Sequence, residues 1–281
     1  MRPTDISPIS RVMRRIDLVA DGSLSGDTVR TGFPSIDRWL GGGVRAGDLV
    51  VLGGDVASGK SALSLAMALR MAETGAKVAF VTGEMSVERV MERALAIEGR
   101  VKVDDLRQGR LTEQQRASVG AAAVRLRDQS PRFEVLSRTP GSAWSLCGRE
   151  TTSQVVIVDS LQALAEGAAP RDEELAALVY RLKAEAVAED DCVIVTAQLP
   201  ALAERNDARP TLDDFGAMGA VKQAADVVLA LYREEMYASD AGVEGATELL
   251  VLKNRNGTTG YVDLYFYKQW LRFEDMLDPD R

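Results

Sequence analysis

The chain has 281 residues, 46% of them apolar, and a formal net charge of −8. This length is enough for one large core or two small ones, and we expect one main domain. No apolar run approaches the ~20 residues that a bilayer crossing requires, and the first residues lack the apolar segment of a secretory signal, so we expect a cytoplasmic protein without a membrane partner. The absence of histidine excludes Ser/His triads and most zinc sites.

The two cysteines and the net charge exclude fewer kinds of site and function than the absence of histidine does. Cys147 and Cys192 lie far apart without metal-ligand spacing, which favours two buried thiols. The net negative charge does not indicate a general affinity for nucleic acid, but a local basic channel would not show in the summed charge, so the charge alone decides nothing.

An amphipathic helix is predicted near the N-terminus, within residues 1–30. Its arginines lie mostly off an apolar stripe that consists of Ile9, Val12, Met13, Ile16 and Val19. Residues 21–26 have the composition of a linker. The helix packs either on its own domain or on a neighbouring subunit, and we favour the neighbour because a single helix precedes the linker. Residues 31–281 then form the main domain.

Strand and helix patterns alternate from residue 48 onward, which predicts an α/β fold with a mostly parallel central sheet flanked by helices. Ser61–Glu73 and Glu173–Glu189 have apolar residues at helical spacing. The short β-branched runs that predict strands are Leu49–Leu52, Lys77–Val81, Gln154–Val158, Cys192–Thr196 and Asp226–Leu231.

The pattern changes after these strands. Glu248–Lys253 and Tyr261–Tyr267 are extended runs joined by residues 254–260. The Asn256-Gly257 pair in this connection predicts a turn with positive φ. The sheet is therefore expected to end in a C-terminal antiparallel β-hairpin.

A phosphate-binding loop is predicted at Gly54–Ser61 (GDVASGKS), which fits G-x-x-x-x-G-K-[ST] at every fixed position between a predicted strand and a predicted helix. Small residues let backbone N–H groups point at phosphate, and the helix N-terminus favours anions. Lys60 would bridge the β- and γ-phosphates of ATP, and Ser61 would coordinate Mg²⁺. The complete fit argues against a glycine-rich turn that carries a lysine by chance. The predicted binding residues are Gly54, Asp55, Val56, Ala57, Ser58, Gly59, Lys60 and Ser61.

Three polar residues stand at the ends of predicted strands, on the edge that also carries the phosphate loop. Asp159 is placed to orient the water shell of Mg²⁺, and Glu84 to polarise the water that attacks the γ-phosphate. Gln198 is placed to sense that phosphate. Any one of them alone is as easily a polar residue that merely ends a strand, but their joint occurrence favours a catalytic site.

These features resemble the RecA-like P-loop ATPase domain of the DnaB family of hexameric replicative helicases. The resemblance extends over residues 30–275, and its later segments are more specific because many RecA-like proteins share the earlier ones. The segments are TGFPSIDRWLGGGVRAGDLVVLGG, GEMS, LRQGRLTEQQ, VVIVDSLQAL, TAQL, GAVKQAADVVLALYREEMY and LKNRNGTTGYVDLYF.

The resemblance implies a homo-oligomeric ring, hexameric in that family, that hydrolyses ATP at its subunit interfaces, moves along single-stranded DNA and unwinds duplex. It also implies that Lys253 and Arg255 reach the γ-phosphate held by a neighbouring subunit, because they match a lysine and an arginine with that role. A cation delivered in trans stabilises charge in the transition state. From the hairpin alone, two solvated cations would be the simpler interpretation.

The chain departs from the family in two places. Full-length members carry an N-terminal collar domain, whereas about 30 residues precede the ATPase domain in this sequence, so the resemblance does not extend to the helper contacts or primase recruitment of such a collar. In the loop that holds single-stranded DNA, the position of the family's arginine is Gly216. Backbone amides from Gly216 to Gly219, together with Arg205, Arg209 and Lys222, are the predicted DNA contacts, with a weaker or differently built grip.

Two other functions remain open. A regulatory or repair ATPase of the KaiC or RadA kind would hydrolyse ATP in a ring without unwinding DNA, and the glycine-rich segments suit it almost as well. The segments LRQGRLTEQQ and ELLVLKNRNGTTGYVDLYF favour the helicases. A structural ring or accessory protein without hydrolysis is the third alternative, and the retention of Lys60, Ser61, Glu84 and Asp159 argues against it.

Overall fold

The computed structural model describes residues 7–21, 27–138, 154–167, 169–203, 205–237 and 242–276. Cys147 lies outside these residues, whereas Cys192 is a buried free thiol, as predicted. The helices are α1 (Pro8–Ala20), α2 (Pro34–Trp39), α3 (Lys60–Glu73), α4 (Val87–Gly99), α5 (Val103–Gln108), α6 (Glu113–Gln129), α7 (Leu161–Leu164), α8 (Arg171–Glu189) and α9 (Ala220–Ala224). The strands are β1 (Thr28–Val29), β2 (Val44–Arg45), β3 (Leu49–Gly54), β4 (Val78–Thr82), β5 (Phe133–Ser137), β6 (Val155–Asp159), β7 (Cys192–Gln198), β8 (Val227–Tyr232), β9 (Ala246–Asn254), β10 (Gly260–Tyr267) and β11 (Arg272–Asp275).

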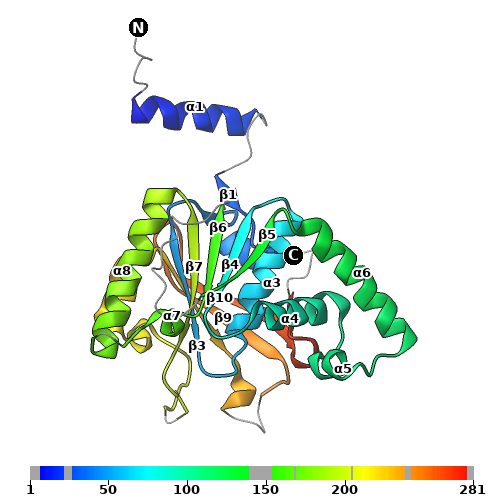
Figure 1. The fold of residues 1–281 in the computed structure, drawn as a ribbon. Coiled ribbons are helices and arrows are strands. Elements are labelled where there is room, and N and C mark those ends of the chain that lie inside the picture. The colour runs from blue at the N-terminus through cyan, green and yellow to red at the C-terminus, as the bar shows by residue number, and fades with distance from the viewer. Residues whose placement is uncertain are drawn as a thin grey trace.

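A nine-stranded sheet in the order β11-β10-β9-β8-β3-β7-β6-β4-β5 forms the centre of the domain (Figure 1). The strands from β8 to β5 in this order run parallel, and β9, β10 and β11 are paired antiparallel. All six residues of β3 are buried, as expected for a strand covered on both faces. The predicted sheet and its antiparallel end are confirmed, although β5 and β11 at its two edges were not predicted.

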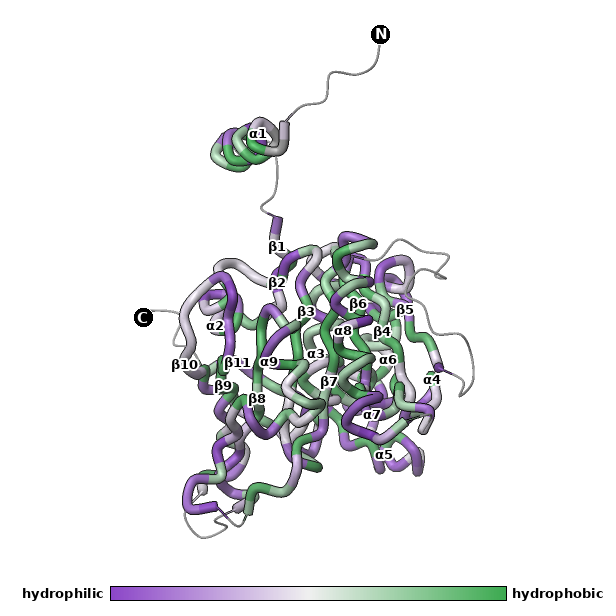
Figure 2. Tube along the Cα trace, turned by 90° about the vertical axis from the view of Figure 1, so that its left-hand side faces the viewer, coloured by the Kyte–Doolittle hydropathy of each residue, from purple (hydrophilic) through white to green (hydrophobic). Residues whose placement is uncertain are grey.

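Helices cover both faces of this sheet, on opposite sides of the strands in Figure 1. One cluster of buried residues includes Met67 of α3 and Ile97 of α4, and the other includes Leu182 of α8 and Val221 of α9. Hydrophobic residues are concentrated in the central strands between these layers (Figure 2). The strands β3, β6 and β7 therefore lie in the interior, and the site can form only where their ends emerge.

The connection between β9 and β10 differs from the prediction. Neither Asn256 nor Gly257 has positive φ, so the expected turn is wrong. The reason is that residues 255–259 form a longer loop, which the side chain of Asn254 organises. Its Oδ1 accepts a hydrogen bond from the Asn256 N–H at 3.1 Å, and its Nδ2 donates to the carbonyl of Trp39 at 2.9 Å.

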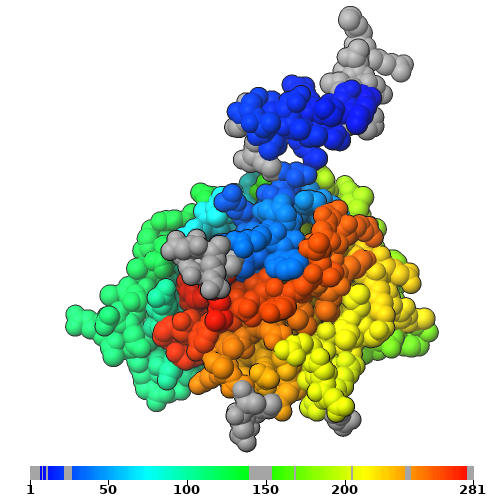
Figure 3. All heavy atoms as spheres, turned by 180° about the vertical axis from the view of Figure 1, so that it is seen from behind, coloured from blue at the N-terminus to red at the C-terminus, as the bar shows by residue number. Residues whose placement is uncertain are grey.

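The N-terminal helix α1 stands apart from the sheet and its covering helices (Figures 1 and 3). Its apolar stripe is exposed, with Ile9 at 66%, Met13 at 51% and Ile16 at 50%. An ion pair of 2.7 Å joins Arg15 of the helix to Asp27, which directly precedes β1. Docking on a neighbouring subunit stays a prediction. None of the described helices combines the length and apolarity that a membrane crossing requires.

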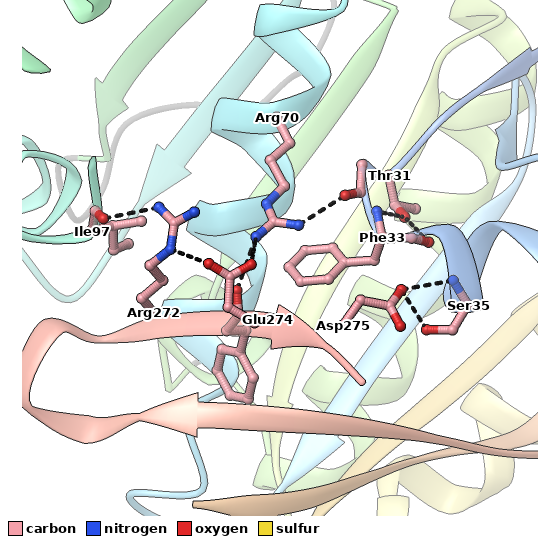
Figure 4. Close-up of polar contacts among 10 residues, drawn as sticks. Thr31, Phe33, Ser35, Arg70, Ile97, Arg272, Glu274 and Asp275 are labelled. Carbon is pink, nitrogen blue, oxygen red and sulfur yellow. Dashed lines mark hydrogen bonds and ion pairs between the residues drawn. The ribbon is translucent and has the colours of Figure 1, made fainter. Parts of the chain in front are cut away.

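Arg70 of α3 joins the two ends of the main domain (Figure 4). Its guanidinium donates to the carbonyl of Gly32 at 2.8 Å and to the carbonyl of Phe273 at 2.9 Å. It also lies 3.9 Å from the centre of the Phe33 ring. The first segment of the domain is thereby attached to the helix that begins at the phosphate loop.

The last strand contacts the same N-terminal segment directly. One oxygen of Asp275 accepts hydrogen bonds from the N–H and the hydroxyl of Ser35, both at 2.7 Å (Figure 4). The orange and red C-terminal strands consequently lie beside the blue segment that follows α1 (Figure 3). Residues far apart in sequence thus close one side of α3.

Candidate active site

The phosphate loop joins the end of β3 to the start of α3, as predicted. Gly54 is the last residue of β3 and Lys60 the first of α3. Gly59 caps the helix with φ 105°, and a Cβ added there would lie 2.8 Å from Cζ of Phe273. Glycine is required at this position both by the backbone conformation and by the packing of the last strand.

Lys60 lies inside the loop with its ammonium group satisfied by the chain itself. The Nζ donates to the carbonyl of Asp55 at 2.7 Å. Burial lowers the pKa of Lys60, although the nearby carboxylates of Asp159, Asp55 and Glu84 act in the opposite direction. Phosphate oxygens would replace the Asp55 carbonyl as acceptors and would compensate the burial of the positive charge.

Asp159 ends β6 beside the loop with 1% of its surface exposed. Its Oδ1 accepts hydrogen bonds from the hydroxyls of Thr196 at 2.6 Å and Ser61 at 3.1 Å. Its Oδ2 is buried without a hydrogen-bond partner among the described residues. Burial raises the pKa of this carboxyl. A buried oxygen without a partner, next to a serine hydroxyl, is suited to a cation or a cation-bound water.

The available ligands fit Mg²⁺ better than a metal held by protein alone. Within the residues that the structure describes, no three His, Cys, Asp or Glu side chains gather in a group that could hold a metal. Asp159 and Ser61 together offer one carboxylate and one hydroxyl. Mg²⁺ commonly keeps several waters and takes its remaining ligands from substrate phosphates.

The other two of the three predicted strand-end residues, Glu84 and Gln198, reach the same edge of the sheet. Glu84 follows β4, is exposed, and accepts a hydrogen bond from the hydroxyl of Ser160. Gln198 ends β7 in register with Gly54. Its N–H donates to Oε1 of Gln162 at 3.0 Å, and Nε2 of Gln162 donates to its carbonyl at 3.1 Å. The backbone of Gln198 is therefore held while its side chain stays exposed.

A cavity of about 610 Å³ adjoins the loop, and part of its lining was not predicted. Besides Lys60 and Ser61, its wall includes Arg93, Arg233 and Lys268. Burial lowers the pKa of Arg93, against the carboxylate charges nearby. Arg233 directly follows β8, so the reasoning that selected the other strand-end residues would have found it. No local pattern marks Arg93 or Lys268.

Lys253 and Arg255 lie at the opposite end of the sheet. Lys253 pairs with Val228 near the start of β8, and its Nζ donates to two carbonyls at the end of α9, each at 2.6 Å. Arg255 forms an ion pair of 2.9 Å with buried Asp226. Both cations are therefore remote from the phosphate loop of their own chain, which adjoins the end of β8.

The predicted DNA-contacting cations are each paired with a carboxylate. The guanidinium of Arg205 and that of Arg209 each donate through two nitrogens. Pairing leaves less positive charge for a phosphate backbone than the three side chains alone suggest. The pairs are Arg205–Asp214, Arg209–Glu248 and Lys222–Asp213.

The two glycines of the predicted DNA loop have left-handed backbone conformations. Gly216 has φ 56° and ψ −133°, which L-residues rarely adopt. Gly219 has φ 78° and caps α9. The glycine at the family's arginine position is thus required by the backbone of this loop, so an arginine there would force the loop into another shape.

Comparison with known proteins identifies the family. Residues 28–275 match the family described as the DnaB-like helicase C terminal domain. The chain belongs to that family. The match begins at β1 and ends in β11, so it spans the sheet, the phosphate loop and the antiparallel end. The resemblance expected from the sequence is confirmed.

Relatives and solved structures of DnaB type cover most of this DnaB-like chain. The replicative DNA helicase DnaB of Geobacillus stearothermophilus is 30% identical over 272 residues, 91% of this chain and 58% of the relative. The replicative DNA helicase DnaC of Bacillus subtilis is 29% identical, with the same two shares. The chain thus spans less than two thirds of the length of these relatives.

The solved structures confirm the RecA-like fold. One of them, an isolated ATPase domain, matches with a TM-score of 0.84 at 22% identity, over 97% of this chain and 100% of that one. The structure of a DnaB-like replicative helicase, which was studied with primase, matches with a TM-score of 0.85 at 23% identity. This match covers 98% of this chain and 69% of that one. A KaiC-like protein of Pyrococcus horikoshii OT3 matches less well, with a TM-score of 0.64 at 14% identity. This match covers 89% of this chain and 99% of that one. The family match favours the DnaB-like interpretation over the KaiC-like one.

Proposed function

We propose that this DnaB-like chain hydrolyses ATP with Mg²⁺ at the seams of a homo-oligomeric ring, hexameric as in the family, and that hydrolysis moves the ring along single-stranded DNA. The proposal is supported by the family match and by the convergence of the phosphate loop, Asp159, Glu84 and Gln198 at one edge of the sheet. The relatives named as replicative helicases support unwinding of duplex DNA as the outcome.

In this proposal each residue has one task. The amides of Gly54–Ser61 and the ammonium of Lys60 bind the β- and γ-phosphates. Ser61 and Asp159 would hold Mg²⁺, which supplies charge neutralisation at the phosphates. Glu84 takes a proton from, or orients, the attacking water, and Gln198 contacts the γ-phosphate.

The position of Lys253 and Arg255 carries the proposal of a seam. They lie beside Val227 and Val228 at the start of β8. Val227 and Leu231, which pairs with Gly54, are four residues apart, about 13 Å along a strand. A side chain cannot reach across that length to its own phosphate loop. In a head-to-tail ring, however, one face of each copy meets the opposite face of the next. Two cations carried there can complete a neighbour's site.

Mixing two inactive variants tests the shared site. Lys60→Ala should abolish turnover because it removes the phosphate ligand, and Arg255→Ala should lower it by about 10³-fold because the trans cation is lost. In mixed rings, some seams combine an intact loop with an intact Arg255. An equimolar mixture should therefore recover about one quarter of the wild-type rate, measured as phosphate release.

A control mixture shows whether mixing two variants raises the rate without restoring an intact site. A mixture of Lys60→Ala with the double variant Lys60→Ala/Arg255→Ala contains no intact loop, and its rate should stay at the background. Failure of the first mixture to exceed the two parent variants, in particles shown by light scattering to be mixed rings, would refute the shared site.

A second function is favoured by one observation, the pairing of all three predicted DNA cations in a chain with Gly216 in the loop. A ring that switches partners without unwinding would have no need of a strong DNA grip. Strand displacement on a forked duplex separates the two functions. The helicase proposal expects ATP-dependent displacement and faster hydrolysis with single-stranded DNA at low salt, whereas the switch hydrolyses ATP and displaces nothing.

A further inference from the structure

A loop that directs its N–H groups at one anion must turn its carbonyls the other way. A carbonyl that faces the protein interior then needs a donor, because an unsatisfied buried acceptor costs a large part of the energy of a hydrogen bond. Two residues that follow β8 donate hydrogen bonds to the phosphate loop, and one of them, Arg233, also lines the cavity beside Lys60 and Ser61.

The first is Arg233, immediately after β8. Its side chain is only 3% exposed, and its NH1 donates to the carbonyl of Ala57 at 3.1 Å. Ala57 has φ 62°, a strained conformation for a residue with a Cβ. A donor on its carbonyl lowers the energy of this conformation relative to alternatives in which the peptide turns.

Arg233 is itself fixed in place from three sides. Its Nε donates to Glu235 at 3.0 Å, and its NH2 donates to the same oxygen. The guanidinium lies 5.0 Å from the centre of the Phe266 ring. Lys268 forms an ion pair of 3.0 Å with the other oxygen of Glu235. A guanidinium held this firmly can define the position of the carbonyl that it contacts.

The second residue is Tyr237, whose hydroxyl donates to Oδ2 of Asp55 at 3.2 Å. Its ring stacks on Tyr232 with a centroid distance of 5.6 Å and an interplanar angle of 6°. Burial and the charge of Asp55 raise the pKa of Tyr237 to about 12, so the hydroxyl keeps its proton. The other oxygen of Asp55 accepts the Val56 N–H at 2.6 Å.

We propose that Arg233 and Tyr237 form a clasp that holds Asp55–Ala57 in the phosphate-binding shape before any ligand arrives. Both are positioning residues through their contacts with Ala57 and Asp55, and Arg233 in addition lines the cavity. The inference rests on the proposed function in one respect, namely that the ligand of the loop is the phosphate chain of a nucleotide. It predicts that loss of either contact loosens the empty loop and weakens every ligand bound through phosphate.

Hydrogen exchange and phosphate binding test the clasp in the full chain. In Arg233→Ala, amide exchange in Gly54–Ser61 without ligand should accelerate, and the affinity for tripolyphosphate with Mg²⁺ should fall about tenfold. Tyr237→Phe keeps the stacking and should show the same changes at about threefold. Tripolyphosphate has no base or sugar, so contacts with those groups do not enter the measurement. Arg233 also lines the cavity, where its positive charge attracts phosphate directly, so the exchange measured without ligand and the uncharged substitution Tyr237→Phe decide whether the effect acts through the loop.

Arg272→Ala is the matched control. Arg272 also donates to a carboxylate two residues later, Glu274, and to a backbone carbonyl, that of Ile97 at 3.1 Å. Ile97 lies in α4, outside the phosphate loop. The control can lose stability, but loop exchange and tripolyphosphate affinity should stay within about twofold of the wild type.

The outcomes separate the clasp from the proposed function. Wild-type protein that binds neither tripolyphosphate nor ATP overturns the proposed function, while the exchange measurement still reads the clasp. Unchanged loop exchange in both clasp variants overturns the clasp even where the wild type binds ATP. If Arg233→Ala does not fold, as judged by circular dichroism, Tyr237→Phe decides alone, and wild-type exchange in that variant overturns the inference.

Discussion

Asp159 is a carboxyl that the fold has removed from water. Burial raises its pKa, and two hydroxyls compensate only one of its oxygens. A raised folded-state pKa means that the folded protein binds a proton more readily than the unfolded chain does. The ionised group therefore lowers stability at neutral pH, and this cost disappears as pH falls below the raised pKa. The buried carboxylate thus lowers the stability of the folded protein but provides a site that a cation can enter.

Asp159→Asn is accordingly expected to be more stable and inactive. At neutral pH its free energy of unfolding should exceed that of the wild type by about 1 kcal/mol, because the neutral amide carries no buried charge. The difference should shrink at acidic pH, where the wild-type carboxyl is protonated. Urea unfolding at several pH values measures it, and an asparagine variant that is less stable at neutral pH would contradict the electrostatic account.

The paired cations near the DNA loop lead to a second prediction at the residue scale. Asp213 is 81% exposed and pairs with Lys222. Asp213→Asn should raise the affinity for single-stranded DNA about threefold at low salt, because it frees a cation and removes a negative charge, and high salt should cancel the gain. Asp128→Asn, which also removes an exposed carboxylate paired with a cation, should leave DNA binding unchanged in a fluorescence titration.

At the scale of elements, α3 connects the phosphate loop to both ends of the domain. It begins at Lys60 and carries Arg70 close to its end. Arg70 donates to carbonyls of the segment before α2 and of β11. The helix is thereby enclosed by the sheet, whose edge strand β11 it contacts, and by the segment before α2, which explains why most of its residues are buried.

Arg70→Met should reveal the strength of this connection. It retains apolar length but removes the Arg70 donor from two carbonyls and from Oε2 of Glu274, so we expect a loss of about 2–4 kcal/mol in the free energy of unfolding. Arg127→Met is the control, because Arg127 is 74% exposed and its loss should cost at most about 0.5 kcal/mol. Equal effects of the two substitutions in urea unfolding would show that the Arg70 contacts contribute little.

At the scale of the whole molecule, the exposed apolar stripe of α1 is a surface that the proposed assembly would cover. A single helix of 13 residues is marginal in water, and an apolar stripe gains stability when another surface covers it. The proposal that α1 docks on the neighbouring copy accounts for both features. It also makes the seam depend on a segment outside the main domain.

Ile16→Ser should therefore weaken assembly. The particle mass measured by light scattering should fall toward that of one chain at concentrations where the wild type is a ring, and hydrolysis should fall with it, because the shared site is lost. Asp17→Ser places the same residue next to the stripe and should leave the mass unchanged. Identical assembly of the two variants would mean that α1 does not hold the ring.

The sequence by itself determined the phosphate loop, the parallel sheet and the edge at which Asp159, Glu84 and Gln198 meet. The loop is a contiguous segment of eight residues, so its chemistry is local. The buried runs mark strands, and parallel strands bring their carboxyl ends to one edge. Those two facts were sufficient without any knowledge of side-chain contacts.

Only the tertiary structure decided the rest. Arg93, Arg233 and Tyr237 approach the loop from α4 and from the end of β8, and no local pattern records which carbonyl a distant guanidinium contacts. The prediction of a turn with positive φ at Asn256 and Gly257 was wrong for the same reason. Asn254 forms hydrogen bonds with Asn256 and with distant Trp39, and these contacts override the intrinsic preference of an Asn-Gly pair for positive φ. Short windows encode backbone periodicity, whereas contacts between distant segments depend on the packing of the entire domain.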